Sequence, residues 1–338
     1  MRTSPTFIIL TLVVAAAVVA GAQSQEGFRF RSGVELVNVT ATVTDNDGRF
    51  VSGLRQEDFT VYEDGQVQDV SHFSSDRVPV SLGIALDASG SMTPEKLAAA
   101  RAAIERLIFK LLNEDDELFF VEFATRAEVT QGWTTDRQLI SDALKRVDPI
   151  GATALYDAVA ESIPLAEEGR NQKKALLVIS DGNDTNSTLD VGQVRKRIRE
   201  SEVLVYALGV DSTSRASSRI MRPPVQLPPS IPFPFPGGRR PQYPPVGGGG
   251  SSWPRGPGER VNADALRQIT DDTGGRTEIV HGFEGLDDAT ARIADELSKQ
   301  YFLGYTSSVN KDGRWHSIRV TVRERGLTVR ARRGYVAS

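Results

Sequence analysis

The 338-residue chain contains no cysteine and only three histidines. Without cysteine there are no disulfide bonds, no thiolate metal ligands, no cysteine nucleophile and no anchor through a lipid-modified cysteine. His72, His281 and His316 lie in or near the two end segments or in a late predicted strand. The sequence DASGS also lacks the G-x-S-x-G elbow, so we do not expect a serine hydrolase.

The chain also lacks a strong charge of one sign, because its formal net charge is −4 and its pI is near 5.6. Whole-chain charge therefore gives no reason to expect a nucleic acid partner. No G-x-G-x-x-G follows the first central strand, which excludes a dinucleotide site of that type. After residue 20 no apolar run is long enough to span a bilayer, so we expect no transmembrane span once the leader is removed.

The first 22 residues have the pattern of an export signal. Arg2 precedes an apolar run over residues 7–20, and Ala20 and Ala22 are placed as an A-x-A cleavage site. We predict a signal peptide over residues 1–22 and a secreted or periplasmic protein. An uncleaved membrane anchor is the alternative.

Both ends of the remaining chain alternate apolar and polar residues with period two, which is typical of half-buried strands. Residues 37–43 alternate in this way, as do residues 318–322 and 327–331 on either side of a turn at Arg325 and Gly326. Each end offers too few strands to bury an apolar face alone. We therefore predict that an N-terminal β segment, residues 33–77, packs with a C-terminal β segment, residues 300–338, as one small β-sandwich-like unit.

Between these ends, apolar runs alternate with helical patterns. The runs at residues 80–86, 118–123, 175–179 and 203–210 resemble buried parallel strands, and residues 94–112 have a helical pattern. Thr93, Pro94 and Glu95 form a sound helix start. The predicted fold class is α/β, a doubly wound and mostly parallel sheet with the flanking β segments.

Polar residues follow two of the predicted central strands. Asp87 closes the first strand and precedes Ser89 and Ser91, Asp181 closes another, and Thr153 lies in a turn. Carboxylates at the carboxyl ends of neighbouring strands would repel each other unless a cation lay between them. An all-oxygen set with two charges suits Mg²⁺ or Mn²⁺, whereas zinc would favour His or Cys.

The residues of this predicted site resemble those of a known family. DASGS at residues 87–91, the glycine-flanked Thr153 before a helix, and SDG at residues 180–182, in this order, resemble the metal-ion-dependent adhesion site of von Willebrand factor type A domains. The resemblance covers residues 78–299, and the β ends also resemble secreted bacterial proteins related to this type. It implies that a divalent ion is held, directly or through water, by Asp87, Ser89, Ser91, Thr153 and Asp181. It also implies that Asp87 and Asp181 end adjacent strands and that an Asp or Glu carboxylate of a protein partner fills the last coordination position.

The sequence thus favours a secreted, metal-dependent binding module of the adhesion type rather than an enzyme. A structural or scaffold role, in which the ion only stabilises the fold, is the main alternative. A phosphohydrolase of the haloacid dehalogenase type is a further alternative, with Asp87 as nucleophile. It would need an acid two residues later, where this chain has Ser89.

Residues 212–258 interrupt the α/β pattern with a composition rich in proline and glycine. Such a composition does not form a packed core, so we expect a disordered or polyproline-rich loop inserted after the strand at residues 203–210. The insert contains six arginines and no Asp or Glu, so it cannot supply the partner's carboxylate. We expect its charge to steer acidic partners toward the metal-bearing edge, with an inert insert as the alternative.

Overall fold

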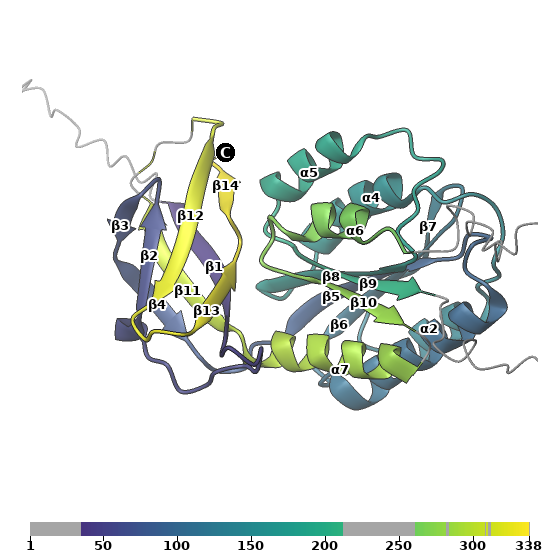
Figure 1. Ribbon diagram of the computed structural model, residues 1–338, viewed down its shortest axis with the longest axis horizontal. Helices are drawn as coiled ribbons and strands as arrows, with labels where there is room; N and C mark the ends of the chain where they lie inside the picture. Colours follow the sequence, from purple (N-terminus) through teal and green to yellow (C-terminus); the bar gives the residue numbers. More distant parts are fainter. Residues whose placement is uncertain (1–34, 212–260, 282–283, 308, 310–311, 338) are drawn as a thin grey trace, which may run out of the picture. The chain divides into compact units, whose positions relative to one another are not determined.

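The computed structural model describes residues 35–211, 261–281, 284–307, 309 and 312–337. The predicted signal peptide and the predicted insert at residues 212–258 lie outside the described residues. Figure 1 shows the two arrangements of strands that the described part contains, a sheet covered by helices and a pair of smaller sheets. Within this part of the chain, no helix has the length and apolar character needed to cross a membrane.

The central sheet has six strands in the order β10-β9-β8-β5-β6-β7. All neighbouring pairs run parallel except β6 and β7, which pair antiparallel at one edge. Because β6 lies on one side of β5 and β8 on the other, the strand order reverses at β5, where α/β sheets form ligand-binding crevices. The strands are β5 (Val80–Asp87), β6 (Glu117–Phe123), β7 (Ala127–Thr134), β8 (Lys173–Ser180), β9 (Leu204–Asp211) and β10 (Thr277–His281).

Helices cover both faces of this sheet (Figure 1). One apolar core joins the sheet to α2, its π-helical extension η2, α3 and α7, and a second joins it to α4, α5 and α6. The helical segments are α2 (Pro94–Arg106), η2 (Leu107–Leu111), α3 (Arg137–Lys145), α4 (Leu155–Glu167), α5 (Val191–Glu200), α6 (Ala263–Thr270) and α7 (Glu284–Lys299).

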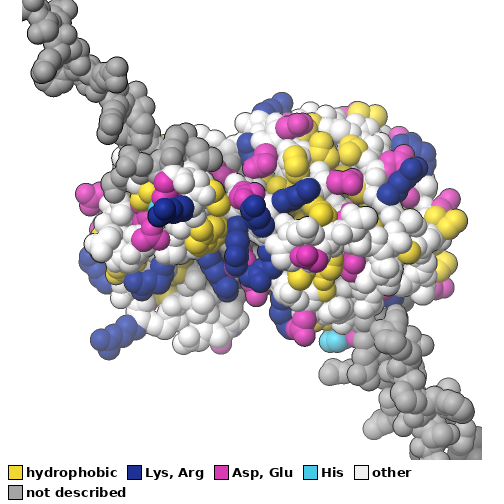
Figure 2. All heavy atoms as spheres, turned by 90° about the horizontal axis from the view of Figure 1, so that it is seen from above, with side chains coloured by type: hydrophobic (Ala, Val, Ile, Leu, Met, Phe, Trp, Pro, Cys, Tyr) yellow, Lys and Arg dark blue, Asp and Glu magenta, His cyan; other side chains and the backbone are white. Residues whose placement is uncertain are grey.

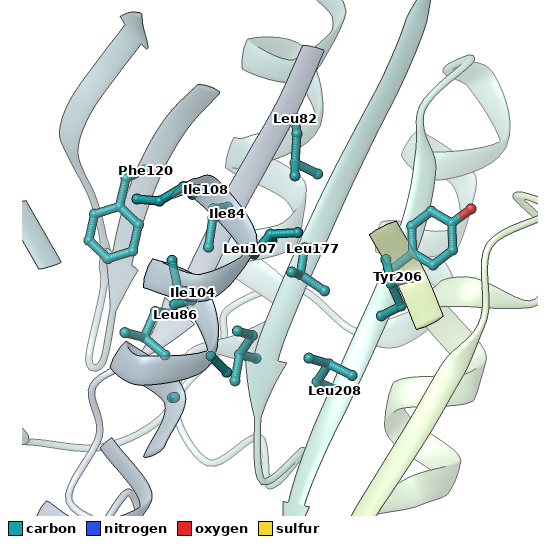
Figure 3. Packing of buried hydrophobic residues seen from close by; sticks show 14 of the residues in the cluster. Leu82, Ile84, Leu86, Ile104, Leu107, Ile108, Phe120, Leu177, Tyr206 and Leu208 are labelled. Atoms are coloured by element: carbon teal, nitrogen blue, oxygen red, sulfur yellow. The ribbon is translucent and has the colours of Figure 1, made fainter. Parts of the chain in front are cut away.

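Burial on both faces explains why the central strands read as nearly continuous apolar runs. Every residue of β5 is buried, and Figure 3 shows Leu82, Ile84 and Leu86 of this strand in the apolar cluster that also contains Ile104 of α2. Gly83 is required within it, because a Cβ there would lie 2.2 Å from the ring of Phe119. Close packing therefore fixes β5, and with it the position of the loop that follows.

The two ends of the chain pack together as a β-sandwich, which confirms the predicted fold class. One sheet has the order β13-β1-β11-β4 and the other the order β14-β12-β2-β3, with a shared apolar core between them. A short 3₁₀ helix, η1 (Gln56–Asp58), precedes β2. The strands are β1 (Glu35–Thr44), β2 (Phe59–Glu63), β3 (Gln66–Gln68), β4 (Val70–Ser74), β11 (Tyr301–Ser307), β12 (Trp315–Val322), β13 (Thr328–Ala331) and β14 (Gly334–Val336).

The sandwich and the helix-covered sheet belong to one compact unit that starts at Glu35. Buried hydrogen bonds connect them: Glu296 at the end of α7 accepts from Thr42 of β1, at 3.1 Å, and from Tyr206 of β9, at 2.9 Å. The Gln300 amide donates to the same two hydroxyls, at 3.0 and 2.9 Å. This polar network holds the start of β11 against the central sheet.

Candidate metal centre

The loop after β5 contains three of the five residues in the predicted site. Asp87 is fully buried, and its Oδ1 accepts a 2.9 Å hydrogen bond from the backbone N–H of Ser89. The hydroxyls of Ser89 and Ser91 lie 3.0 Å apart. The loop is anchored where the Ala88 N–H donates to the carbonyl of Phe123 at the end of β6. Its side chains are thereby held at the carboxyl edge of the sheet.

The loop after β8 contributes Asp181, which is 1% exposed. Its neighbour Ser180 donates a 2.5 Å hydrogen bond to Oδ2 of Asp87 and accepts one of 2.9 Å from the N–H of Gly182. Gly182 has φ +75, and a Cβ there would lie 2.7 Å from the carbonyl oxygen of Asn262. Adjacent strand ends therefore place both aspartates at one point, as the resemblance implied.

Thr153 lies in a third loop, before α4, and is 3% exposed. The carbonyl of Gly151 accepts a 3.0 Å hydrogen bond from the N–H of Gly90, which ties this loop to the loop after β5. The N–H of Thr153 donates to the hydroxyl of Thr185 at 2.9 Å, which ties it to the loop after β8. All five predicted residues thus lie on three connected loops at one edge of the sheet.

Two further residues, which the sequence analysis did not identify, belong to this site. Ser180 bridges the two strand ends, as described. Lys96, on the first turn of α2, directs its ammonium to the carbonyl of Ser91 at 3.0 Å and to Oδ2 of Asp181 at 3.4 Å. The capped helix start predicted at Thr93 is confirmed, because its hydroxyl accepts from the N–H of Lys96. The turn that this cap fixes sends the lysine side chain inward.

The electrostatics of the site favour a bound cation. The pKa of Asp87 is raised to about 6, chiefly by burial and in part by the negative charge of Asp181, while hydrogen bonds from Ser180 and Ser89 act to lower it. Lys96 supplies one positive charge for two carboxylates, so ionised Asp87 is left without a cationic partner in the described residues. A hard divalent cation would supply it.

The oxygen atoms of the five predicted residues are suitable ligands for a hard divalent cation. Two carboxylates and three hydroxyls are the oxygen ligands that Mg²⁺ and Mn²⁺ prefer. In the described part of the chain, no cluster of three or more His, Cys, Asp or Glu side chains has a geometry that could hold a metal ion. The candidate site depends instead on hydroxyl oxygens around its two acids.

Residues 82–183 match the model of the von Willebrand factor type A domain, and the match includes all five predicted residues. The chain therefore contains a von Willebrand factor type A domain.

Individual relatives match part of the chain. Human matrilin-3 is 24% identical over 157 residues, which is 42% of this chain and 32% of matrilin-3. The uncharacterized protein sll0103 of Synechocystis is 28% identical over 140 residues, 39% of this chain and 32% of that protein. The chain thus spans about a third of the length of these two relatives. A solved von Willebrand factor type A structure from Catenulispora acidiphila is 14% identical, with a TM-score of 0.48, and covers 89% of this chain and 73% of that one.

Proposed function

We propose that the chain is an exported, adhesion-type binding module without catalytic activity. Asp87, Ser89, Ser91, Thr153 and Asp181 hold Mg²⁺ or Mn²⁺, directly or through water. The bound ion supplies an electrophilic position that accepts an Asp or Glu carboxylate from a protein partner.

One observation carries this proposal: two aspartates, each almost fully buried, lie at the ends of neighbouring strands, and a single lysine pairs with one of them, Asp181. Taking two carboxylates out of water is costly, and for Asp87 the hydrogen bonds from Ser89 and Ser180 offset that cost only in part, because its pKa remains raised. A bound cation would stabilise both buried carboxylates, which best explains why the fold keeps them in this position. The three neutral hydroxyls add ligand oxygens without further neutralising the ion, so that it still attracts an acid.

The rim of this edge also offers an apolar contact. Ile150, just before the Thr153 loop, is 74% exposed, although its N–H is fixed by a 2.8 Å hydrogen bond to the carbonyl of Ala88. An exposed isoleucine held this close to the candidate centre suits a partner that presents apolar surface beside its acidic residue. Its side chain therefore contributes to partner affinity without contacting the ion.

A capture experiment tests the function. The protein is immobilised and incubated with proteins from the medium or periplasm of its source, once with Mg²⁺ and once with EDTA. We expect a partner that the parent retains with Mg²⁺, that EDTA releases, and that Asp87→Asn does not retain. An Ile150→Ser variant is expected to retain less of it while binding Mn²⁺ as the parent does.

The matched control is Asp142→Asn, which removes a half-exposed aspartate of α3 that pairs with Lys145 and is not one of the five predicted residues. It should retain the partner as the parent does. A partner that stays bound in EDTA, or that Asp87→Asn retains equally well, would instead support the scaffold role, in which the ion only stabilises the fold.

A further inference from the structure

A groove of about 400 Å³ lies between the helix-covered sheet and the β-sandwich. One wall is formed by the end of α6 and the turn into β10, and the other by β12, β13 and the residues that follow β13. It lies at the opposite edge of the central sheet from the candidate metal centre. The five residues of β10 separate the two edges by about 16 Å at the usual rise of a strand.

Arginine dominates this groove. Asp271 is the one acidic residue among those that line it. Figure 2 shows Lys and Arg side chains gathered at the junction of the two parts of the molecule. The net charge of the chain is −4, so the groove has the opposite sign to the chain as a whole. Its arginines are Arg267, Arg276, Arg319, Arg330, Arg332 and Arg333.

Buried acids beneath the groove hold several of these arginines in place. Glu296, with a side chain 5% exposed, pairs with both Arg276 and Arg330. Asp272, also 5% exposed, pairs with Arg333 at 3.6 Å and with two arginines of α5 at 2.8 and 2.9 Å. Glu296 and Asp272 thus each serve two or three guanidinium groups, which fixes their positions. Arg276 also pairs with Glu278 and Arg267 with Asp264, and the arginines still outnumber these acids.

Two of the arginines have guanidinium N–H groups without an acceptor in the described part of the chain. The Arg319 guanidinium lies 4.1 Å from the ring centroid of Tyr62 and forms no ion pair with any described carboxylate. Arg332 is about nine-tenths buried, pairs with Glu202 through Nη1, and has an Nε–H without an acceptor. The exposed Arg319 guanidinium is therefore available to an anionic ligand, whereas the Nε–H of Arg332 is buried.

The groove also exposes strand edges. The chain crosses from one sheet of the sandwich to the other at Arg332, so β14 pairs with β12 only from Trp315 to Ser317. The Ile318 N–H still donates to the carbonyl of Arg333, at 2.8 Å, and beyond Ile318 β12 has no strand neighbour on that side among the described residues. β13 is the edge strand of its own sheet, and its end at Ala331 is covered by Gly274. Val329 is half-buried between the two edges, whereas Ile318, which also lines the groove, is 6% exposed and belongs to the core of the sandwich. Unpaired strand edges beside apolar side chains are the surface to which an extended peptide adds.

We propose that this groove is a second binding site, which takes an extended acidic peptide segment of a partner protein. The peptide backbone runs along the open part of the strand edge, an apolar side chain contacts Val329, and its carboxylates pair with Arg267 and Arg319. A single-stranded nucleic acid fits less well, because no aromatic side chain among the described residues lines the groove to stack on a base. The site does not depend on the metal centre.

The test uses the full chain in EDTA, so that the candidate metal centre does not contribute. The probe is a fluorescein-labelled peptide of four Glu-Val repeats, and the control peptide has four Gln-Val repeats. We expect fluorescence anisotropy to give a dissociation constant at least about tenfold lower for the acidic peptide, with binding that weakens as salt is raised. Equal binding of the two peptides, or no binding, would overturn the proposal.

Two variants locate the site. Arg267→Gln and Arg319→Gln remove charges that hold neither Glu296 nor Asp272, so the fold should persist. Each is expected to weaken binding of the acidic peptide about fivefold, and the double variant more than tenfold. Arg49→Gln, which removes the same charge from an exposed position elsewhere, is the control and should bind as the parent does. If the groove variants bind the acidic peptide as tightly as Arg49→Gln does, the peptide does not bind in this groove.

A second probe separates the peptide from another acidic polymer. A uronate oligosaccharide with the same number of carboxylates is titrated against the bound peptide. The strand edges and apolar contacts favour the peptide, so the oligosaccharide should bind at least about tenfold more weakly. Equal or tighter binding of the oligosaccharide would overturn the assignment to a peptide.

Discussion

The ammonium of Lys96 lies 3.4 Å from Oδ2 of Asp181, and both side chains are at least 96% buried. Lys96 thereby neutralises one of the two acids of the candidate metal centre before any ion binds. The arrangement has two consequences of opposite sign. The lysine stabilises the metal-free protein, because breaking a buried pair leaves an uncompensated charge, and its own charge opposes a second cation nearby.

Replacing Lys96 by methionine should therefore uncouple stability from metal affinity. In EDTA we expect Lys96→Met to lower the free energy of unfolding by about 3 kcal/mol, because Asp181 loses its partner. In saturating Mn²⁺ the loss should shrink, because the variant is expected to bind the ion about tenfold more tightly. Urea unfolding in the two conditions measures both effects.

Lys145→Met is the matched control, since Lys145 pairs with Asp142 at an exposed position. Its effect should be below about 0.5 kcal/mol in both conditions. A loss for Lys96→Met that is the same with and without Mn²⁺ would mean that no cation reaches Asp181.

His316 of β12 should make the stability of the sandwich depend on pH. Its Nδ1 lies 2.7 Å from Asp64 and its Nε2 lies 3.1 Å from Asp312. Burial lowers the pKa of the imidazole, but the hydrogen bonds and charges of the two carboxylates raise it, and the net result lies above the ordinary 6.5. A raised folded-state pKa adds stability that is complete below pH 6.5 and is lost as the pH rises through the folded value.

We therefore expect His316→Gln to cost about 1 kcal/mol at pH 5.5 and progressively less toward pH 8.5. Chemical unfolding of parent and variant at several pH values gives this difference. His72→Gln, which removes an exposed histidine with no ion pair in the described residues, is the control. A cost for His316→Gln that grows with pH would contradict the assigned partners.

Gly274 should be indispensable where the sandwich meets the central sheet. It has φ +88, and a Cβ there would lie 2.8 Å from the carbonyl carbon of Ala331 and 2.9 Å from the N of Arg332. We expect Gly274→Ala to cost more than about 3 kcal/mol, because backbone strain and overpacking act together. Thermal unfolding measures the cost.

Gly48→Ala separates the two causes, because Gly48 has φ +75 but no atom within 4 Å of the added Cβ. Its cost should be about 1 kcal/mol, from backbone strain alone. If the two substitutions lower the free energy of unfolding by similar amounts, the backbone of residues 331 and 332 leaves room for a Cβ at residue 274.

The arginine-rich insert gives a kinetic prediction. Asp211, which ends β9, and Asn262, whose N–H donates to the carbonyl of Asp181 at 2.8 Å, flank the undescribed residues at the candidate metal edge. Replacing residues 212–258 by a short Gly/Ser link should leave Mn²⁺ affinity unchanged. It should slow association with an acidic partner about tenfold at low salt and less at high salt, as measured by surface plasmon resonance. An unchanged association rate at low salt would identify the insert as inert.

The features that could be predicted from the sequence are those that a local pattern determines. Burial on both faces gives β5 and β8 their continuous apolar runs, and the polar residues that end such runs must lie at one edge of the sheet. The end segments alternate with period two because the sandwich has one core and two outer faces. These patterns were enough to predict the fold class and to select the five candidate residues.

Other features depend on contacts between distant segments. The position of β11 between β1 and β4 follows from packing that no single strand encodes. The antiparallel edge strand β7 was not predicted, because its residues are mostly half-buried or exposed and lack a clear pattern. Lys96 and Ser180 are ordinary surface and strand residues in the sequence. Their roles depend on the rotation of α2 and on the register of β8 against β5.

Calorimetric titration of Mn²⁺ into the metal-free protein tests the central claim most directly. The parent should bind one ion, and Asp87→Asn should lose about a hundredfold or more in affinity while keeping its fold, since the asparagine can still accept from Ser89. Ser180→Ala, which removes only the group that orients Asp87, should lose about tenfold, and Asp142→Asn should lose nothing. If Asp87→Asn binds Mn²⁺ as tightly as the parent, the ion is not held at this edge of the sheet.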